Sequence, residues 1–327
     1  MWKTTTVLLV LAIGIAILLN QDDRDVPNLP ETFWGPERNR EASEEIRSFV
    51  IEVPKSVIDD LKDRLAKKKE LVPPLENTAW TYGTSTTYLE NVLEHWRTKY
   101  NWTERQALLN KYPQYVTNIQ GLDIHFYHVK PHVPSDRNLK VVPLLIVHGW
   151  PGSVVEFQKI IPMLTTPRPD RDFVFEVIAP SLPGYGFSQA AVRPGLGPAE
   201  MSVIFKNLML RLGFNKFYVQ GGDWGSLIVT HISSLFSDKL PVNVPSACAA
   251  FPHEILYHSE VLLRYKYTNL IQHNHLPRGG HFAAMEEPSL LANDIFEFVS
   301  KTEDIRKKAE NKDIPNRTEK VKEPSKT

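Results

Sequence analysis

Apolar residues recur along this chain with two different spacings, and the change between them separates two regions. From residue 114 onward, short alternating or continuous apolar runs are separated by longer amphipathic stretches. This order of strand and helix patterns is typical of an α/β protein with a mostly parallel sheet. Between residues 55 and 113 the apolar residues recur every three or four positions instead, which predicts helices.

Three helices are predicted in the region before residue 114. The first is indicated by four apolar residues at helical spacing that stop before a proline pair: Val57, Ile58, Leu61 and Leu65. A second is predicted over 89–96, and a third from Thr103, where Gln106 would complete a capping box. The stretch 22–54 is polar and interrupted by prolines, so we expect it to lie extended over a domain surface. Region 22–113 is thus an extended and helical N-terminal region.

The strands of the α/β region follow from its short apolar runs. Two alternating runs, 115–120 and 122–129, meet at Gln120–Gly121 and predict a hairpin. The continuous apolar runs 141–147 and 173–180 are typical of parallel strands that are covered on both faces. Residues 114–300 are therefore predicted to form an α/β domain with right-handed crossovers.

Beyond residue 240 the pattern predicts two more short strands and a closing helix. One strand is expected near Val242–Phe251, the next with its turn in the stretch 271–288, and the helix over Leu290–Val299. Segment 301–327 is rich in Lys, Glu, Asn and Pro and is predicted to be disordered.

The stretch Phe217–Ser226, FYVQGGDWGS, predicts a strand, a sharp turn and the start of a helix, with Asp223 at the turn. In the nucleophile elbow of α/β hydrolases, small flanking residues allow a strained turn that lifts one reactive side chain above the sheet. Here that side chain is a carboxylate. The alternative is an ordinary strand–helix connection in which Asp223 only caps the helix.

A glycine-containing loop, HGWPGS at 148–153, follows the apolar run 141–147 directly. A tight turn at the end of a parallel strand directs backbone N–H groups toward the place where an oxyanion forms. The first such donor would be the amide of Trp150, and the second that of Trp224, the residue after the elbow carboxylate. A generic glycine turn is the alternative for the loop alone.

A histidine and an acid are expected downstream of the nucleophile, because this fold orders its site residues as nucleophile, acid and histidine. His281, in the RGGHF loop, fits as the histidine, and Glu254, in FPHE, fits as the acid. Position alone leaves alternatives open. His253, His273 and His275 lie nearby, and a glutamate is usually just solvated.

Composition narrows the classes of function. Lys+Arg and Asp+Glu both number 38, so the net charge of zero gives no reason to expect a nucleic-acid partner. The single cysteine, Cys248, excludes an internal disulfide and weakly favours a reducing compartment. The 11 histidines show no HExxH or paired Cys/His spacing, so neither a metal nor a cofactor is expected.

The first 21 residues are predicted to be a membrane anchor. Thr4–Gln21 carries no charge and lies between Lys3 and Asp22, and its length is at the lower limit for crossing a bilayer. A cleaved signal peptide is disfavoured, because ILLNQDD offers no small residues before a cut. The flanking charges do not decide the orientation.

Five motifs in order, GGDWGS, HGWPGS, SLPGYGFS, FPHE and RGGHFAAMEEP, resemble the microsomal epoxide hydrolases, and in particular the insect juvenile hormone epoxide hydrolases. The resemblance extends from the N-terminus to about residue 300. It implies Asp223 as nucleophile, Glu254 as acid, His281 as base and the Trp150 and Trp224 amides as oxyanion donors. It also implies a lipophilic epoxide as substrate, a diol as product, and a single-pass attachment to the endoplasmic reticulum or microsomal membrane with a cytosolic catalytic domain.

The chain departs from that family where a helical cap domain with two acidic tyrosines is inserted before the strand that bears the acid. From Asp223 to Glu254 there are only 31 positions, which leave no room for a cap and little for another strand and helix. We place the junction between Ser237 and Val244. The next strand must then pair beside the elbow strand or leave a gap in the sheet. In the first case Glu254 and His281 would move by about 4.8 Å, beyond hydrogen-bonding reach.

These departures leave three functions open. An epoxide hydrolase in shortened form would turn over little, because Tyr257, Tyr265 and Tyr267 lie in no matching motif and the site has no lid. An Asp-nucleophile dehalogenase would need no acid for its leaving group, although the helical N-terminal region argues against it. A non-catalytic form would bind a lipophilic ligand or a partner through the face above the sheet.

Overall fold

The computed structural model describes residues 29–237 and 242–312, which fall into two compact units. The helical unit is Ser48–Gln114. The sheet unit combines the described parts of Met1–Arg47 and Tyr115–Thr327.

The helical unit contains the three helices that the sequence predicts, α2 (Lys55–Ala66), α3 (Thr86–Thr98) and α4 (Trp102–Leu109). Helix α4 begins one residue before the predicted start, because the side chain of Asn101 accepts a 3.0 Å hydrogen bond from the Thr103 amide. The predicted capping box is wrong. The Gln106 side chain instead accepts a 2.8 Å hydrogen bond from the amide of Val53.

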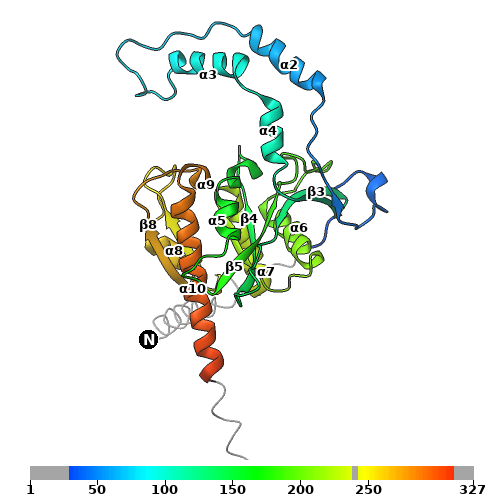
Figure 1. The fold of residues 1–327 in the computed structure, drawn as a ribbon, viewed down its shortest axis with the longest axis vertical. Helices are drawn as coiled ribbons and strands as arrows, with labels where there is room; N and C mark the ends of the chain where they lie inside the picture. The colour runs from blue at the N-terminus through cyan, green and yellow to red at the C-terminus, as the bar shows by residue number, and fades with distance from the viewer. Residues whose placement is uncertain (1–28, 238–241, 313–327) are drawn as a thin grey trace, which may run out of the picture. The chain divides into compact units, whose positions relative to one another are not determined.

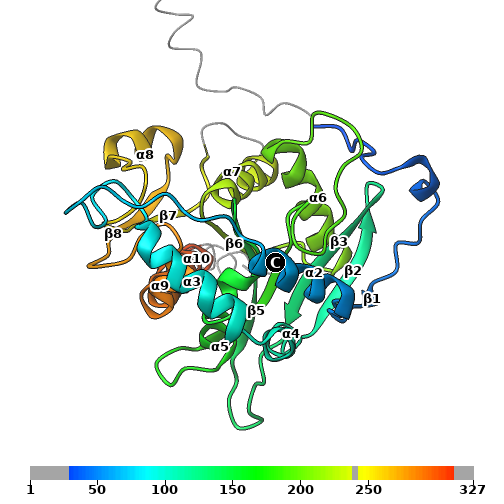
Figure 2. The same ribbon diagram turned by 90° about the horizontal axis from the view of Figure 1, so that it is seen from above.

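In the described part of the chain, the main sheet of the sheet unit has six strands in the order β1-β2-β3-β5-β4-β6. These are β1 (Arg47–Ser48), β2 (Gln114–Ile119), β3 (Leu122–Val129), β5 (Phe173–Pro180), β4 (Lys140–Val147) and β6 (Tyr218–Gly221). Strand β4 is parallel to β5 and β6, and β3 is antiparallel to β5. The two buried strands (Figure 1) and the predicted hairpin (Figure 2) are confirmed.

Helices cover both faces of the main sheet. On one face, α6 (Pro198–Arg211) and α7 (Trp224–Ser237) bury Leu208 and Ile228 against Leu145 and Ile178. Each aliphatic side chain that is fully removed from water contributes about 1.5–3 kcal/mol. The other face holds the short helix η3 (Val154–Phe157) and α5 (Ile160–Thr165). The same core includes Val147 at the end of β4, and Val219 of β6 packs against it, so part of the core lies next to the predicted elbow.

The segment that precedes β1 lies over the β2–β3 turn, as predicted for the described residues from 29 onward. It includes the short helix η2 (Glu37–Asn39). Trp34 is buried, and its amide donates a 2.8 Å hydrogen bond to the carbonyl of Gln120. Gly35 lies so close to the turn that a Cβ there would be 1.9 Å from the Gly121 carbonyl oxygen.

Two further strands form a separate parallel pair, β7 (Ser246–Ala250) and β8 (Leu270–His275), with α8 (Glu260–Lys266) between them in the sequence. Within the described residues β7 pairs with β8, and β6 is the last strand of the main sheet. Of the two predicted arrangements, the gap in the sheet is the correct one. The expected junction falls partly on residues 238–241, which lie outside the described residues.

The chain continues through α9 (Ala283–Glu286) into a long helix, α10 (Pro288–Lys312), which starts two residues before the predicted one. The prediction of disorder from Lys301 is wrong up to Lys312. Glu303 is buried there, and Lys307 forms a 3.0 Å ion pair with Asp172, so part of the charged segment packs against the sheet unit. Residues 313–327 lie outside the described part of the chain.

The expected anchor, Thr4–Gln21, also lies outside the described residues. Among the helices that the structure does describe, none combines the length and the apolar character needed to cross a bilayer.

Candidate active site

Asp223 lies on a strained turn between β6 and α7. Its backbone φ of +50° is in the left-handed region that residues with a side chain rarely adopt. The turn needs small neighbours. A Cβ on Gly225 would lie 2.1 Å from the carbonyl oxygen of Val147, and one on Gly221 would lie 2.4 Å from the Gly225 carbonyl. A Cβ on Gly222 would meet nothing within 4 Å, so only two of the three glycines are required by space.

The loop after β4 contacts the carboxylate directly. The backbone amide of Trp150 donates a 2.8 Å hydrogen bond to Oδ1 of Asp223. A Cβ on Gly149 would lie 2.5 Å from the same oxygen, so glycine at 149 allows this close approach. Trp224 is the first residue of α7, and its amide is therefore one of the N–H groups that have no partner within the helix.

His281 lies between two carboxylates, one in a loop of each sheet. Its Nδ1 atom lies 2.5 Å from Oε1 of Glu254, and its Nε2 atom lies 3.5 Å from Oδ2 of Asp223. Glu254 follows β7 and His281 follows β8, and the two loops are fastened by a 3.1 Å hydrogen bond from the His253 amide to the carbonyl of Gly279. The structure thus brings Asp223, His281 and Glu254 together.

The other nearby histidines lie elsewhere in the described structure. His273 and His275 are on β8 with their rings 4.7 Å apart, and Tyr257 stacks on His275. His253 is exposed. The expected displacement of Glu254 and His281, which followed from a shifted strand, does not occur.

The charges around His281 determine its protonation. The hydrogen bond with Glu254 raises its pKa above the usual 6.5, and the negative charges of Asp223 and Glu156 raise it further, although burial acts in the opposite direction. The imidazolium form is therefore stabilised between the two carboxylates. This arrangement suits a base that must accept a proton from water.

Glu156, in η3, is a titratable group near this site that the sequence patterns did not identify. Its Oε1 atom is buried without a hydrogen-bond partner and lies where a Cβ on Gly152 would be. Burial raises its pKa to about 7, the charge of His281 lowers it, and that of Asp223 raises it. The available signal was a lone acidic residue four positions after Gly152 in the otherwise apolar run VVEF.

No tyrosine hydroxyl in the described residues is hydrogen-bonded to Asp223 or His281. Tyr257 and Tyr265 are exposed, and the Tyr267 hydroxyl lies 2.8 Å from Oγ1 of Thr230 on α7. Only eight residues, 238–245, separate α7 from β7. The connection between α7 and β7 is therefore too short to hold a helical insertion, as the sequence predicts.

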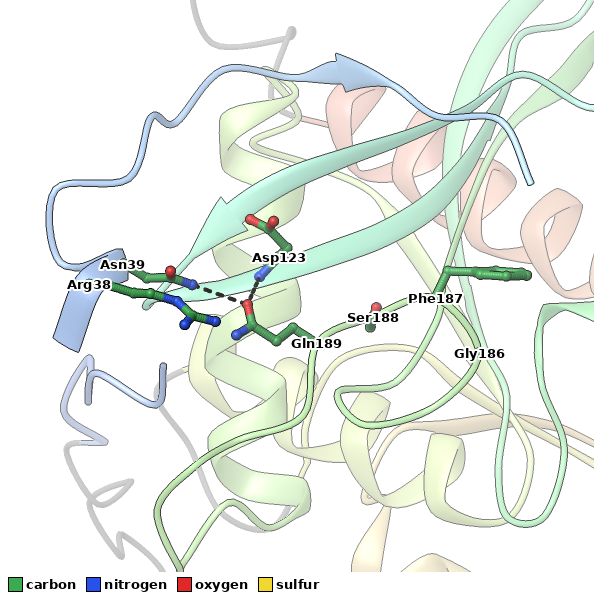
Figure 3. A pocket seen from close by; sticks show the side chains of 7 residues that line it. All are labelled: Arg38, Asn39, Asp123, Gly186, Phe187, Ser188 and Gln189. Atoms are coloured by element: carbon green, nitrogen blue, oxygen red, sulfur yellow. Dashed lines mark hydrogen bonds between the residues drawn. The ribbon is translucent and has the colours of Figure 1, made fainter. Parts of the chain in front are cut away.

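A separate hollow of about 440 Å³ lies near the β2–β3 turn. Asp223, His281 and Glu254 do not line it. Figure 3 shows Gln189 at its centre, where its Oε1 atom accepts hydrogen bonds from the Asn39 side chain at 3.1 Å and the Asp123 amide at 3.2 Å. These polar groups satisfy one another. The hollow is therefore a packing feature of the N-terminal segment and the hairpin.

The strand order, the strained carboxylate at the elbow and the histidine after the last strand define an α/β hydrolase with an aspartate at the nucleophile position. Two family models match the chain in agreement with this. Residues 46–157 match the epoxide hydrolase N terminus, and residues 142–251 match the alpha/beta hydrolase fold.

Juvenile hormone epoxide hydrolase 2 of Ctenocephalides felis is 35% identical over 457 aligned positions, which cover 94% of this chain and 98% of the relative. Epoxide hydrolase 1 of Oryctolagus cuniculus is 32% identical and covers 90% and 98%. The crystal structure of juvenile hormone epoxide hydrolase from the silkworm Bombyx mori superposes with a TM-score of 0.79 at 32% identity, covering 84% of this chain and 99% of that one. The chain belongs to the epoxide hydrolase family.

This chain is shorter than the part of the Ctenocephalides felis protein that it matches. The match spans 457 positions and the whole chain has 327 residues, so at least 130 positions of that protein have no counterpart here. The short connection between α7 and β7 is the place where the family resemblance puts the cap domain. The fold and the triad geometry are therefore present without the length that a cap requires.

Proposed function

We propose that this chain is an epoxide hydrolase that acts on lipophilic epoxides through an ester of Asp223, and that its ring-opening step is slow. The contact of His281 with both carboxylates carries the proposal, since a histidine between a nucleophile and an orienting acid is the arrangement that ester hydrolysis needs. A juvenile hormone or a foreign epoxide would be the substrate, by similarity to the relatives.

In the first step Oδ2 of Asp223 attacks an epoxide carbon, and the carbon–oxygen bond of the ring breaks. Oδ2 is the oxygen that remains, because Oδ1 accepts the hydrogen bond of the Trp150 amide. A carboxylate with an ordinary pKa near ~4 is ionised at neutral pH and needs no activating base. The ring oxygen stays on the neighbouring carbon as an alkoxide and takes a proton from water, which leaves hydroxide, since the described site offers no tyrosine hydroxyl.

In the second step His281 removes a proton from water, and the resulting hydroxide attacks the ester carbonyl carbon of Asp223. Glu254 holds the imidazole through Nδ1 and stabilises its positive charge. The oxyanion forms at Oδ1, between the amides of Trp150 and Trp224. The ester C–O bond then breaks, and the departing diol oxygen takes the proton held by His281. Asp223 keeps one oxygen from water and returns to a carboxylate by giving its proton to the hydroxide formed in the first step.

Slow ring opening follows from the missing acid and lid. A positioned acid or base contributes typically 10²–10⁴-fold to a proton-transfer step. We therefore expect ring opening to limit turnover and the ester not to accumulate in the unaltered chain. The hydrolytic half of the reaction retains all its groups.

A single turnover in H₂¹⁸O tests the proposal. The chain is incubated in excess over an epoxide such as a juvenile hormone analogue, and the peptide that contains Asp223 is examined by mass spectrometry. Diol formation with ¹⁸O in that peptide is expected, and Asp223→Asn should abolish both. If the unaltered chain yields neither diol nor label, the catalytic proposal is wrong and the non-catalytic alternative is favoured.

A second substrate class is favoured by one observation, the missing acid. Halide is a leaving group that needs no proton, so Asp223 could displace it from an alkyl halide through the same ester. The single-turnover assay in H₂¹⁸O, run in parallel with an alkyl halide and with an epoxide, discriminates the two substrate classes. Halide release with ¹⁸O labelling of Asp223, in the absence of epoxide turnover, would favour dehalogenation.

Attachment to the endoplasmic reticulum membrane through Thr4–Gln21 is part of the proposal. It is supported by the uncharged run and by similarity to the microsomal family. Extraction of membranes at alkaline pH tests it. The full chain should stay in the pellet, and a chain that lacks residues 4–21 should be released to a larger extent.

A further inference from the structure

The reacting groups are divided between two sheets that share no strand pairing in the described residues. Asp223 follows β6 and Trp150 follows β4, both in the main sheet, whereas Glu254 and His281 follow β7 and β8. In a continuous sheet, backbone hydrogen bonds would fix the distance between these loops. Here the 3.5 Å approach of His281 to Asp223 depends on other contacts.

Helix α10 makes such contacts with the main sheet. Glu303 is 6% exposed, and its carboxylate accepts hydrogen bonds from the Tyr218 hydroxyl of β6 at 2.9 Å and from the Lys140 ammonium of β4 at 2.5 Å. Phe296, on the same side of the helix, packs on Phe175 of β5 with ring centroids 4.8 Å apart. These contacts fix α10 to β4 and β6, which lead to Trp150 and Asp223, and to β5, the neighbour of β4.

The same helix makes polar contacts with the β7–β8 pair. Asp294 is 7% exposed, and its carboxylate accepts a 2.7 Å hydrogen bond from the Asn274 side chain of β8. The Asp294 carbonyl accepts a 3.0 Å bond from Gln272, whose own side-chain oxygen accepts a bond from Lys301. Figures 1 and 2 both show α10 beside the β7–β8 pair.

The spacing of the two buried acids explains how one helix reaches both sheets. Asp294 and Glu303 are nine positions apart, which at about 100° per residue places them on opposite flanks of the helix and roughly 13 Å apart along it. The apolar face between those flanks is formed by Ile295 and Val299, which are buried. One flank therefore holds β8 and the other holds β4 and β6.

We propose that Asp294 is a positioning residue for the ester-hydrolysis step: with Glu303 as the opposite anchor, it holds the β7–β8 pair so that His281 stays within reach of Asp223. The helix thereby replaces the missing strand between β6 and β7. This rests on the proposed function for its kinetic consequences, but not for its structural one. Other links between the sheets exist, such as Thr230 with Tyr267, so the effect of losing Asp294 is a displacement rather than a separation.

The two half-reactions make the proposal testable. Ring opening uses Asp223 and Trp150 on the main sheet, and only hydrolysis needs His281 and Glu254. Loss of the Asp294 hydrogen bond should therefore slow hydrolysis while ring opening continues. A displacement of about 1 Å can cost roughly 100-fold in rate, so we expect at least about a tenfold loss in hydrolysis.

The experiment compares Asp294→Ala with Asp294→Asn, which retains an acceptor for Asn274, and with Asp304→Ala, which removes an exposed acid from the same helix. Single-turnover mass spectrometry measures formation and decay of the Asp223 ester. In Asp294→Ala the ester should decay at least about tenfold more slowly and its level should rise by the same factor over that in the unaltered chain, with its formation rate within about twofold. Asp294→Asn should restore decay, and Asp304→Ala should behave as the unaltered chain.

A structural role alone would lower both half-reactions together, and that result, or unchanged ester decay, would overturn the proposal. NMR titration of the His281 ring gives a readout that needs no turnover. The pKa of His281 should fall in Asp294→Ala, because the charge of Asp223 then contributes less, and an unchanged titration would count against displacement. If Asp294→Ala does not fold, Asn274→Ala removes the same hydrogen bond from β8 and is measured in its place.

Discussion

The amide of Trp150 holds Oδ1 of Asp223 at 2.8 Å, and this single hydrogen bond makes the two oxygens of the carboxylate inequivalent. The other oxygen, Oδ2, faces His281 at 3.5 Å. In the proposed reaction the oxygen held by the amide becomes the ester carbonyl oxygen, so the oxyanion donor would be in place before the substrate binds. This geometry supports the proposed order of events, attack by Oδ2 and then hydrolysis beside His281.

Replacement of His281 should separate these events. In His281→Gln, Asp223 still attacks the epoxide, but no base activates water, so the ester should accumulate and its decay should slow by about 100-fold or more. Intact-protein mass spectrometry would show a mass increase equal to that of the epoxide, and peptide mapping would place it on Asp223.

The double variant Asp223→Asn/His281→Gln is the control and should show no mass increase. Diol formation by His281→Gln at the unaltered rate would contradict the assigned role of His281.

The pH dependence of ester decay should report the raised pKa of His281. Neutral imidazole is the active base, so the decay rate should rise with pH and level off above the raised pKa. In the ester Asp223 carries no charge, but the hydrogen bond with Glu254, the largest cause of the raised pKa, is retained. Glu254→Gln removes the hydrogen-bonded charge that raises this pKa most. The midpoint should move to lower pH and the plateau should fall, because the imidazole loses its orienting partner.

Pre-steady-state decay of a preformed ester, measured from pH 5 to pH 9, checks both effects. Glu297→Gln, an exposed glutamate on α10, is the matched control and should leave the midpoint in place. A Glu254→Gln midpoint at or above that of the unaltered chain would disprove the electrostatic account.

Local sequence patterns predicted the elements that depend on local chemistry. The hairpin, the strands β4 and β5, and the elbow with Asp223 follow from alternation, continuous apolar runs and the glycine spacing. His281 and Glu254 were expected from their order in the chain, and in the structure their side chains are hydrogen-bonded to each other. These features are set by neighbours in the sequence or by the connectivity of the fold.

The features that sequence reasoning missed depend on contacts between distant residues. The segment after Lys301 has the composition of a disordered tail. However, Glu303 accepts a hydrogen bond from Lys140, 163 positions away, and the helix continues to Lys312. Whether the last two strands would shift or leave a gap was undecided, because the anchor on Asp294 is a tertiary contact. The burial that raises the pKa of Glu156 likewise cannot be predicted from the residues next to it in the sequence.

Glu156 should make the stability of the protein depend on pH in a direction opposite to that of most carboxylates. Its pKa rises from 4.5 to about 7 on folding, chiefly because it is buried. A carboxyl with a raised pKa binds more protons in the folded state, so its contribution is largest below pH 4.5 and is lost as pH rises through about 7. Glu156→Gln removes this penalty, so relative to the unaltered chain its free energy of unfolding should gain about 2 kcal/mol between pH 5 and pH 9.

Urea denaturation of both proteins at pH 5, 7 and 9 measures that difference. Glu176, paired with His128 on the main sheet, gives a comparison at another site, and Glu176→Gln should not reproduce the rise. A gap between the Glu156→Gln and unaltered proteins that is constant with pH would show that Glu156 is ionised normally in the folded protein.

Gly225 and Gly222 should respond very differently to the same substitution, although they flank the same aspartate. A Cβ on Gly225 would lie 2.1 Å from the Val147 carbonyl oxygen, which is backbone of β4 and unable to move away cheaply. Gly225→Ala should therefore cost about 2–3 kcal/mol of stability and displace Asp223 from the Trp150 amide, so that ester formation is lost. A Cβ on Gly222 meets nothing within 4 Å, and Gly222→Ala should stay within about 1 kcal/mol of the unaltered chain and still form the ester. Urea denaturation and the single-turnover assay on both variants check this, and equal behaviour of the two would mean that space around the elbow does not determine its geometry.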